Sequence, residues 1–133
     1  MPRDSDSQEL ARAWLDRAKG NLARARQPKP EEGFWEDLCF DAQQAAEKAV
    51  KAVLALYALD FPRTHQIGEL LEILRRAGHH LIEQLARADR LSEYAVTTRY
   101  PKAARPVDEV EYRQAIQLAE GVVRWAESVV RGA

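Results

Sequence analysis

The chain of 133 residues carries 20 Lys and Arg against 21 Asp and Glu, so its formal net charge is -1. Hydrophobic residues make up 46% and charged residues 31%, a mix that excludes both a disordered chain and a membrane-embedded one. A protein that coats nucleic acid would be far more basic. The charge balance therefore excludes a broad polyanion-binding surface but allows a small basic site.

A single cysteine, Cys39, excludes an intrachain disulfide and a cysteine-based zinc cluster. Its apolar neighbours at helical spacing predict a buried, unreactive thiol. The N-terminus is polar and acidic, unlike a signal peptide, and no apolar run approaches the roughly 20 residues of a membrane-spanning helix. We therefore expect a cytoplasmic protein made of one domain, residues 1–133.

Helical periodicity dominates the chain, and the alternation typical of strands is almost absent. The first helix is predicted over residues 7–26, with Asp6 and Glu9 as a capping box at its start. The prolines of residues 27–30 end it.

The second predicted helix, residues 34–59, is the longest and the most clearly amphipathic. Its apolar stripe consists of Trp35, Cys39, Ala42, Ala46, Ala49, Val50, Val53 and Tyr57. The opposite line, which we expect to face solvent, carries Asp37, Asp41, Gln44, Lys48 and Lys51.

The second half of the chain predicts shorter pieces and one more long helix. Thr64 is expected to cap a helix that ends at Gly78, and a further helical piece is expected from residue 81 to residue 91 or beyond. Prolines break residues 97–107, and Asp108 then starts the last helix as the first half of a capping box with Glu111. Short connections between such helices favour an all-α, antiparallel bundle of four to five helices.

Two polar stretches stand out against this helical background. Gln43 and Glu47 lie one turn apart at the edge of the apolar stripe, where an unpaired polar group would cost about 1–3 kcal/mol. They either pair with a loop or a neighbouring helix to hold the bundle in register, or line a binding site. Arg99-Tyr100-Pro101 offers a cation, an aromatic face and a bend, which suits a phosphate, a carboxylate or a base. Its structural alternative is an arginine closing onto Glu47 or onto a helix C-terminus.

Several catalytic signatures are missing. No glycine-rich phosphate loop and no His-Glu-x-x-His motif occurs, so we expect no cofactor and no metal ligands. His65, His79 and His80 lack the carboxylate or thiol neighbours of a metal site. The pair His79-His80 follows a helix-ending glycine, which indicates a solvated turn.

These stretches together resemble the HEPN domain family over nearly the whole chain. The resemblance rests on Trp14-Leu15-x-x-Ala18, on the run from Cys39 to Ala52 around Gln-Gln-Ala-Ala-Glu-Lys, on Thr64-His65-x-Ile67 and on Arg99-Tyr100-Pro101. It implies a bundle of four to five helices that is usually a homodimer, often encoded beside a minimal nucleotidyltransferase. The family's name reflects a proposed nucleotide-binding role.

The resemblance also raises the alternative of an enzyme, because many HEPN proteins are metal-independent RNA endonucleases, often toxins. These use an arginine and a histidine separated by four to six residues, the arginine stabilising phosphate and the histidine acting in acid–base chemistry. Counting from Arg99, the expected histidine is missing. A formal match occurs only between Arg75 and His80, at the end of the third predicted helix.

Together, the resemblance and the missing histidine predict that the chain is a non-catalytic module. It would bind a nucleotide or substrate for a nucleotidyltransferase in a toxin–antitoxin-like system. The alternatives are an RNA endonuclease toxin that uses Arg75 and His80, and a purely structural dimerisation partner. The expected ligand-binding residues are Gln43, Gln44, Glu47, Lys48, Lys51, Thr64, His65, Arg99 and Tyr100.

Aromatic residues independently suggest self-association. Trp14, Trp35, Tyr94 and Trp125 are a generous supply for so small a bundle, and we expect them to be exposed. A two-fold dimer could bury some of them.

Overall fold

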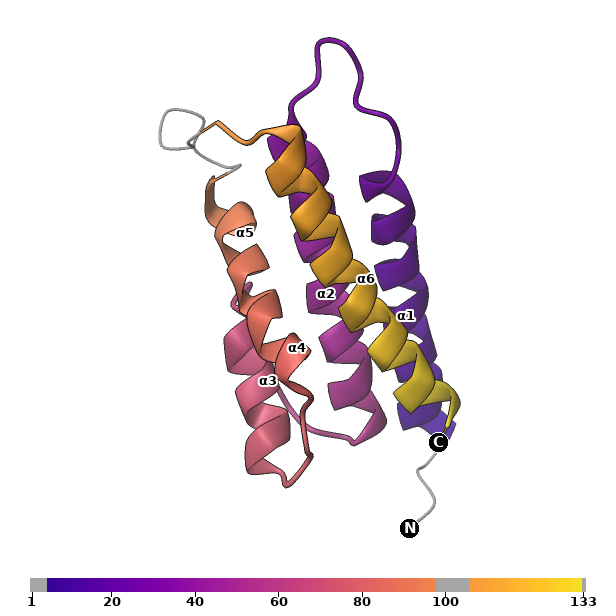
Figure 1. Cartoon of the computed structure of the whole chain (residues 1–133). Coiled ribbons are helices and arrows are strands. Elements are labelled where there is room, and N and C mark those ends of the chain that lie inside the picture. The colour runs from indigo at the N-terminus through magenta and orange to yellow at the C-terminus, as the bar shows by residue number, and fades with distance from the viewer. Residues whose placement is uncertain (1–4, 98–105, 133) are drawn as a thin grey trace.

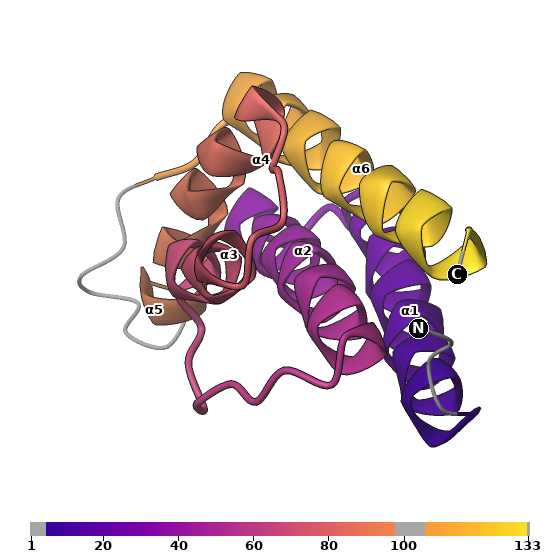
Figure 2. The ribbon, with the colours of Figure 1, turned by 90° about the horizontal axis from the view of Figure 1, so that it is seen from below.

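The computed structural model describes residues 5–97 and 106–132, and within these ranges all regular elements are helical. Three long helices lie side by side (Figure 1): α1 (Ser5–Ala25), α2 (Trp35–Leu56) and α6 (Glu109–Arg131). A shorter arm packs on the other side of α2 (Figure 2): α3 (Ile67–Arg76), α4 (Glu83–Arg87), the 3-10 helix η1 (Ala88–Ser92) and α5 (Glu93–Thr97). The predicted all-α bundle is confirmed.

Helix α1 runs antiparallel to both of its long neighbours. Ion pairs join Lys19 to Glu127 and Arg26 to Glu120, so the two chain segments pass in opposite directions. The rings of Trp35 and Tyr112 lie 4.8 Å apart, which places the first turns of α2 and α6 together. These two helices run the same way because α3 to α5 lead the chain back to the starting end of α2 (Figure 1).

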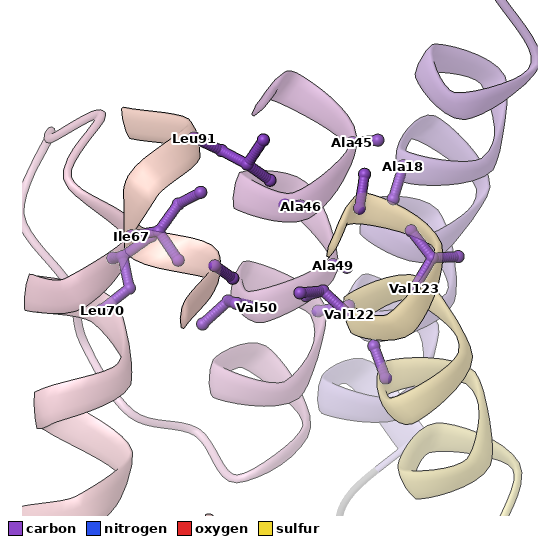
Figure 3. Packing of buried hydrophobic residues seen from close by; sticks show 14 of the residues in the cluster. Ala18, Ala45, Ala46, Ala49, Val50, Ile67, Leu70, Leu91, Val122 and Val123 are labelled. Atoms are coloured by element: carbon purple, nitrogen blue, oxygen red, sulfur yellow. The ribbon is translucent and has the colours of Figure 1, made fainter. Parts of the chain in front are cut away.

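Alanines are frequent among the buried residues of the three long helices. A single methyl group lets the helix axes approach closely, and Ala45 of α2 lies beside Ala18 of α1 (Figure 3). The buried alanines are Ala11, Ala18 and Ala25 in α1, Ala42, Ala45, Ala46, Ala49, Ala52 and Ala55 in α2, and Ala115, Ala119 and Ala126 in α6. Larger side chains such as Ile67, Leu70 and Leu91 fill the side of α2 that faces the arm. Cys39 is buried, as predicted.

Two predicted helix starts are wrong. Helix α1 already includes Asp6 in its first turn, so Asp6 is not its cap. Helix α3 begins at Ile67, three residues after Thr64, whose hydroxyl accepts a local hydrogen bond from the Gln66 amide. Such local bonds form turns in place of helix caps. At α6 the prediction is confirmed, because the Asp108 side chain accepts from the Glu111 amide at 2.8 Å.

The start of α3 is capped from a distant segment instead. The Ile67 amide donates to Ser92 Oγ at 2.9 Å, and the Gly68 amide donates to Asp89 Oδ1 at 2.7 Å. A Cβ atom at Gly68 would lie 2.8 Å from the Asp89 carboxyl carbon, so only glycine lets this carboxylate approach. The single helix predicted from residue 81 to residue 91 or beyond is broken into α4, η1 and α5, and the 3-10 helix η1 contains both Asp89 and Ser92, which cap α3.

The expected exposure of aromatic residues is only partly correct. Tyr94 is buried and its hydroxyl donates to Glu111, while the three tryptophans are half-buried. The large apolar side chains that are exposed are Leu10, Phe34, Ile82, Val96 and Val110.

Among the described residues, no helix combines the length and the apolar character that crossing a bilayer would require. The irregular segment expected over 97–107 falls mainly on residues 98–105, outside the described ranges.

Helix α2 ends in a turn that is strained at Ala58. The Leu59 amide donates to the Leu54 carbonyl at 2.9 Å, and the Ala58 amide donates to the Ala55 carbonyl at 3.0 Å. These two hydrogen bonds form a common helix C-terminal motif, in which the residue before the last one adopts the left-handed backbone conformation. In α2 this residue is Ala58, with φ 55°. The same motif ends α3 with Gly78 at φ 95°, where no Cβ is strained.

We predict that Ala58→Gly stabilises the protein by about 0.5–1 kcal/mol, because glycine adopts the left-handed conformation without a steric penalty. Urea unfolding followed by circular dichroism measures the change in the free energy of unfolding. The matched control is Gly78→Ala, which introduces the same strain at the end of α3 and should destabilise. A destabilised Ala58→Gly variant would contradict this account of the turn.

Candidate functional site

A buried amide and a buried carboxylate occupy the middle of α2. Gln43 is fully buried and Glu47 is 3% exposed. The Gln43 Nε2 atom donates to Glu47 Oε1 at 2.8 Å and to the His65 carbonyl oxygen at 3.4 Å. The spacing of four residues puts both side chains on one face of the helix, turned toward the loop of residues 57–66.

Two further side chains form hydrogen bonds with the Glu47 carboxylate. Lys51 Nζ donates to Oε2 at 2.8 Å, and His65 Nδ1 lies 2.9 Å from Oε1. Gln43, Lys51 and His65 thus surround Glu47, and we call these four residues the Glu47 network. The predicted group of Gln43, Glu47, Lys51 and His65 is therefore brought together by the fold.

The pKa of Glu47 shows which influence prevails inside this network. Burial favours the neutral carboxyl and would raise the pKa, but the hydrogen bonds with Lys51, His65 and Gln43 together outweigh it. The pKa is lowered from its ordinary value. Glu47 is therefore a carboxylate at neutral pH, held in place by its partners.

Lys51 also connects the network to an aromatic pair. Its Nζ lies 5.3 Å from the Trp14 ring centre and 5.6 Å from that of Phe61. The two rings meet edge to face, with centroids 6.3 Å apart. Lys51 is thus held between a buried carboxylate and two aromatic faces, an arrangement that leaves its side chain little freedom.

Part of the line of polar residues expected to face solvent on α2 instead faces α1. Asp41 is 8% exposed and lies 3.4 Å from the Arg24 guanidinium, and Lys48 Nζ donates to Asn21 Oδ1 at 2.7 Å. Burial raises the pKa of Asp41 and lowers the pKa of Lys48. The predicted solvent-facing line is confirmed at Asp37, which is exposed, but it is wrong at Asp41 and Lys48, because α1 carries a matching polar row and a polar seam joins the two helices.

A hollow of about 330 Å³ opens on the surface at this seam. It is lined by Leu10, Ala13, Trp14, Arg17 and Lys48. No carboxylate within the described residues forms an ion pair with Arg17 or Lys48, whereas Lys51 is paired with Glu47 and Arg24 with Asp41. The charged residues that line the hollow are therefore two cations, and they lie beside an aromatic ring.

The remaining predicted ligand residues lie at different distances from this site. Gln44 donates to Gln43 Oε1 at 2.7 Å and so supports the network from its edge. Thr64 serves the local turn at Gln66 and makes no hydrogen bond to the network in the part of the chain that is described. Arg99 and Tyr100 lie outside the described residues.

The Arg75–His80 alternative lies at the far end of α3. Arg75 Nε donates to Glu72 Oε2 at 2.8 Å, and no hydrogen bond joins Arg75 to His80 in residues 5–97 and 106–132. His80 is exposed, as a solvated turn predicts. His79 differs from that expectation, because its ring stacks on Tyr57 with centroids 4.0 Å apart.

Sequence reasoning missed the contribution of α1 to the site. Arg17, Asn21 and Arg24 recur at helical spacing beside the buried stripe of Ala18 and Leu22. A polar row next to a buried stripe indicates a seam with another helix, and this signal could have been read. Within the described ranges, no three His, Cys, Asp or Glu side chains gather as ligands for a metal ion.

Comparisons with known proteins agree with this architecture. The model of the HEPN domain matches residues 11–129. The crystal structure of TT1696 from Thermus thermophilus is similar, with a TM-score of 0.78 and 32% identity over 90% of this chain and 97% of that chain. The crystal structure of ST0689, an archaeal HEPN homologue, has a TM-score of 0.72 and 26% identity over 98% of this chain and 99% of that one. No curated protein matches the chain.

We predict that Glu47→Gln lowers the free energy of unfolding near neutral pH by about 1–3 kcal/mol, because Lys51 loses its buried counter-charge and His65 loses a carboxylate hydrogen-bond partner. The folded-state pKa of Glu47 lies below the ordinary 4.5, so its charge stabilises the fold above that pH and the effect is lost as pH falls through the folded pKa. The difference between wild type and variant should therefore shrink in acid. Urea unfolding across this pH range measures it, and a difference that grows in acid would contradict the assignment.

Proposed function

Since the chain belongs to the HEPN domain family, we propose that it is a non-catalytic module that binds a nucleotide or a nucleotide-like substrate at the hollow between α1 and α2. The observation that carries this proposal is a hollow lined by two cations, Arg17 and Lys48, neither of which forms an ion pair within the described residues, beside the Trp14 ring. The family resemblance adds the expectation of a separately encoded minimal nucleotidyltransferase as partner, in a toxin–antitoxin-like system.

The charges of the seam favour an anionic ligand. Burial lowers the pKa of Lys48, and the charges of Arg17, Lys51 and Arg24 lower it further, whereas the nearby carboxylate of Glu47 acts in the opposite direction. The direct hydrogen-bond partner of Lys48 is Asn21, a neutral acceptor, and the carboxylates of Glu47 and Asp41 act on Lys48 only through their charge. A phosphate between Arg17 and Lys48 would pair directly with both cations and accept charge-assisted hydrogen bonds.

The apolar wall of the hollow favours a ligand that also carries a ring. Trp14 is half-buried and Leu10 is 52% exposed, so both offer apolar surface next to the cations. Bases stack on aromatic side chains with little sequence preference. A nucleoside phosphate combines a flat base and a phosphate, and it matches this pairing better than inorganic phosphate.

The Glu47 network acts as the support of the site in this proposal. It fixes Lys51 beneath Trp14 and Phe61 and ties the loop of residues 57–66 to α2. Its carboxylate is occupied by Gln43, Lys51 and His65, and Arg75, the arginine of the enzyme alternative, is held by Glu72. These contacts favour binding over cleavage.

We predict a saturable heat in calorimetric titration of the protein with AMP. Lys48→Ala and Arg17→Ala should each weaken binding about tenfold, because each removes one charge-assisted hydrogen bond to the phosphate. The matched control is Arg12→Ala, which removes an exposed arginine from the same helix outside the hollow. Thermal unfolding of each variant verifies that the fold is intact.

Further titrations separate the base from the phosphate. Inorganic phosphate should bind more weakly than AMP, and Trp14→Leu should reduce this difference because the stacking surface is lost. The absence of a saturable heat with AMP, ATP and inorganic phosphate would refute the proposed ligand.

We also predict that the purified protein leaves single-stranded RNA intact in EDTA. The reason is that the Arg75 guanidinium is bound to Glu72 and shares no hydrogen bond with His80 in the described structure. Gel electrophoresis of labelled RNA checks this. Cleavage that disappears in both Arg75→Ala and His80→Ala would establish the enzyme alternative in place of ours.

A further inference from the structure

A further hollow, of about 680 Å³, lies between α1 and α6. The two helices pack side by side and run in opposite directions (Figures 1 and 2). Leu22 and Val123, each 5% exposed, are its buried apolar lining residues. We call this hollow the α1–α6 furrow. The charged residues that line it are four cations and two acids, namely Lys19, Arg26, Arg124, Arg131, Glu120 and Glu127.

Both acids of the furrow are already bound to cations. Glu120 pairs with Arg26. Glu127 pairs with Lys19 and, at 3.3 Å, with Arg131. The pKa of Glu127 is lowered, chiefly by its hydrogen bond with Lys19, so Glu127 is a carboxylate at neutral pH. Two carboxylates thus serve three cations, which leaves one positive charge of these three unbalanced.

Arg124 adds a second unbalanced charge. It is exposed, and within residues 5–97 and 106–132 it forms no ion pair and no hydrogen bond through its side chain. It follows Glu120 by four residues and precedes Glu127 by three, so the three side chains lie on one face of α6. Because other cations hold both of these carboxylates, the Arg124 guanidinium is available to an anion from solution.

The spacing of the cations favours an extended anion. Lys19 and Arg26 are seven residues apart on α1, and so are Arg124 and Arg131 on α6, which is about 10.5 Å in each case at 1.5 Å per residue. A single phosphate group reaches one part of such a row, whereas a chain of phosphate groups can contact several cations at once. Three of the four cations are arginines, whose planar guanidinium binds phosphate oxygens through two parallel hydrogen bonds.

The furrow differs chemically from the hollow between α1 and α2. Among the described residues that line the furrow, none is aromatic, so a nucleobase would have no ring on which to stack. We propose that the α1–α6 furrow binds a short linear polyphosphate, such as pyrophosphate or tripolyphosphate, with Arg124 as the central contact. Each phosphate group carries negative charge, so two or three of them balance the two excess positive charges within a short length.

This inference does not depend on the nucleotide proposal. The furrow and the hollow of Arg17 and Lys48 have no lining residue in common. Binding of tripolyphosphate and binding of AMP can therefore be lost separately.

Calorimetric titration of the full chain with sodium tripolyphosphate tests the proposal. The titration is made at low ionic strength, since salt screens exposed charges. We expect a saturable heat that Arg124→Gln weakens about tenfold, because the variant loses one charge-assisted contact with phosphate. The matched control is Arg113→Gln, which removes an exposed arginine of the same helix outside the furrow and should bind as wild type does.

A second variant should act in the opposite direction. Glu127→Gln removes the carboxylate that competes with the ligand for Lys19 and Arg131, so tripolyphosphate should bind about threefold or more tightly. Ion pairs this close to the surface contribute little to stability, and thermal unfolding verifies that the variant is folded. A purely structural role of these charges would not produce tighter binding.

Separate arms identify the site and the class of ligand. Lys48→Ala should leave tripolyphosphate binding within about twofold of wild type, and Arg124→Gln should do the same for AMP. Sulfate and succinate should bind at least about tenfold more weakly than tripolyphosphate. The inference is overturned if tripolyphosphate gives no saturable heat, if Arg124→Gln leaves its binding unchanged, if Lys48→Ala abolishes it, or if sulfate or succinate binds equally well.

Discussion

A negative charge buried in the middle of the central helix determines much of the surrounding structure. Glu47 lies on α2, which packs against α1 and α6 on one side and the arm on the other, and a buried carboxylate is stable there only if it is paired and hydrogen-bonded. Gln43, Lys51 and His65 meet this requirement. Because His65 belongs to the loop of residues 57–66, pairing the charge also fixes the path by which the chain leaves α2 and enters α3.

The same constraint extends outward to the proposed ligand site. Lys51 is held by Glu47, and it lies against the rings of Trp14 and Phe61. Trp14 in turn forms a wall of the hollow that contains Arg17 and Lys48. The buried Glu47 thus supports a feature of the surface through two successive contacts, from Glu47 to Lys51 and from Lys51 to Trp14. The small alanine side chains between the long helices complement this, since they allow α1 to approach α2 closely enough for a polar seam.

The sequence predicted the helices well and their ends less well. Periodicity located the long helices, and Asp108 marked the start of α6 because its cap is local. The cap of α3 could not be found in this way, since Ser92 and Asp89 are more than 20 residues away along the chain and reach α3 only after the arm has folded. A single helical wheel likewise predicted an exposed line on α2, because it contains no information on the polar row of α1 that covers it.

Within the site, spacing identified the residues that share one helix, whereas contacts between different helices could not be predicted from the sequence. Gln43, Glu47 and Lys51 were identified because they share a helix, and His65 came from the family resemblance. Asn21 and Arg17 were missed, as their role depends on how α1 and α2 are rotated relative to each other. The arginine and tyrosine at 99 and 100 lie outside the described residues, so their proposed contribution to ligand binding stays a prediction.

An amide NMR titration of the isotope-labelled protein with AMP tests most directly whether the hollow between α1 and α2 is the ligand site. We predict that the resonances that shift belong to residues around Trp14, Arg17 and Lys48, including the Trp14 indole, and that they shift together with one saturation curve. Shifts that saturate at another surface, such as the α1–α6 furrow, or no shifts at all, would contradict the account.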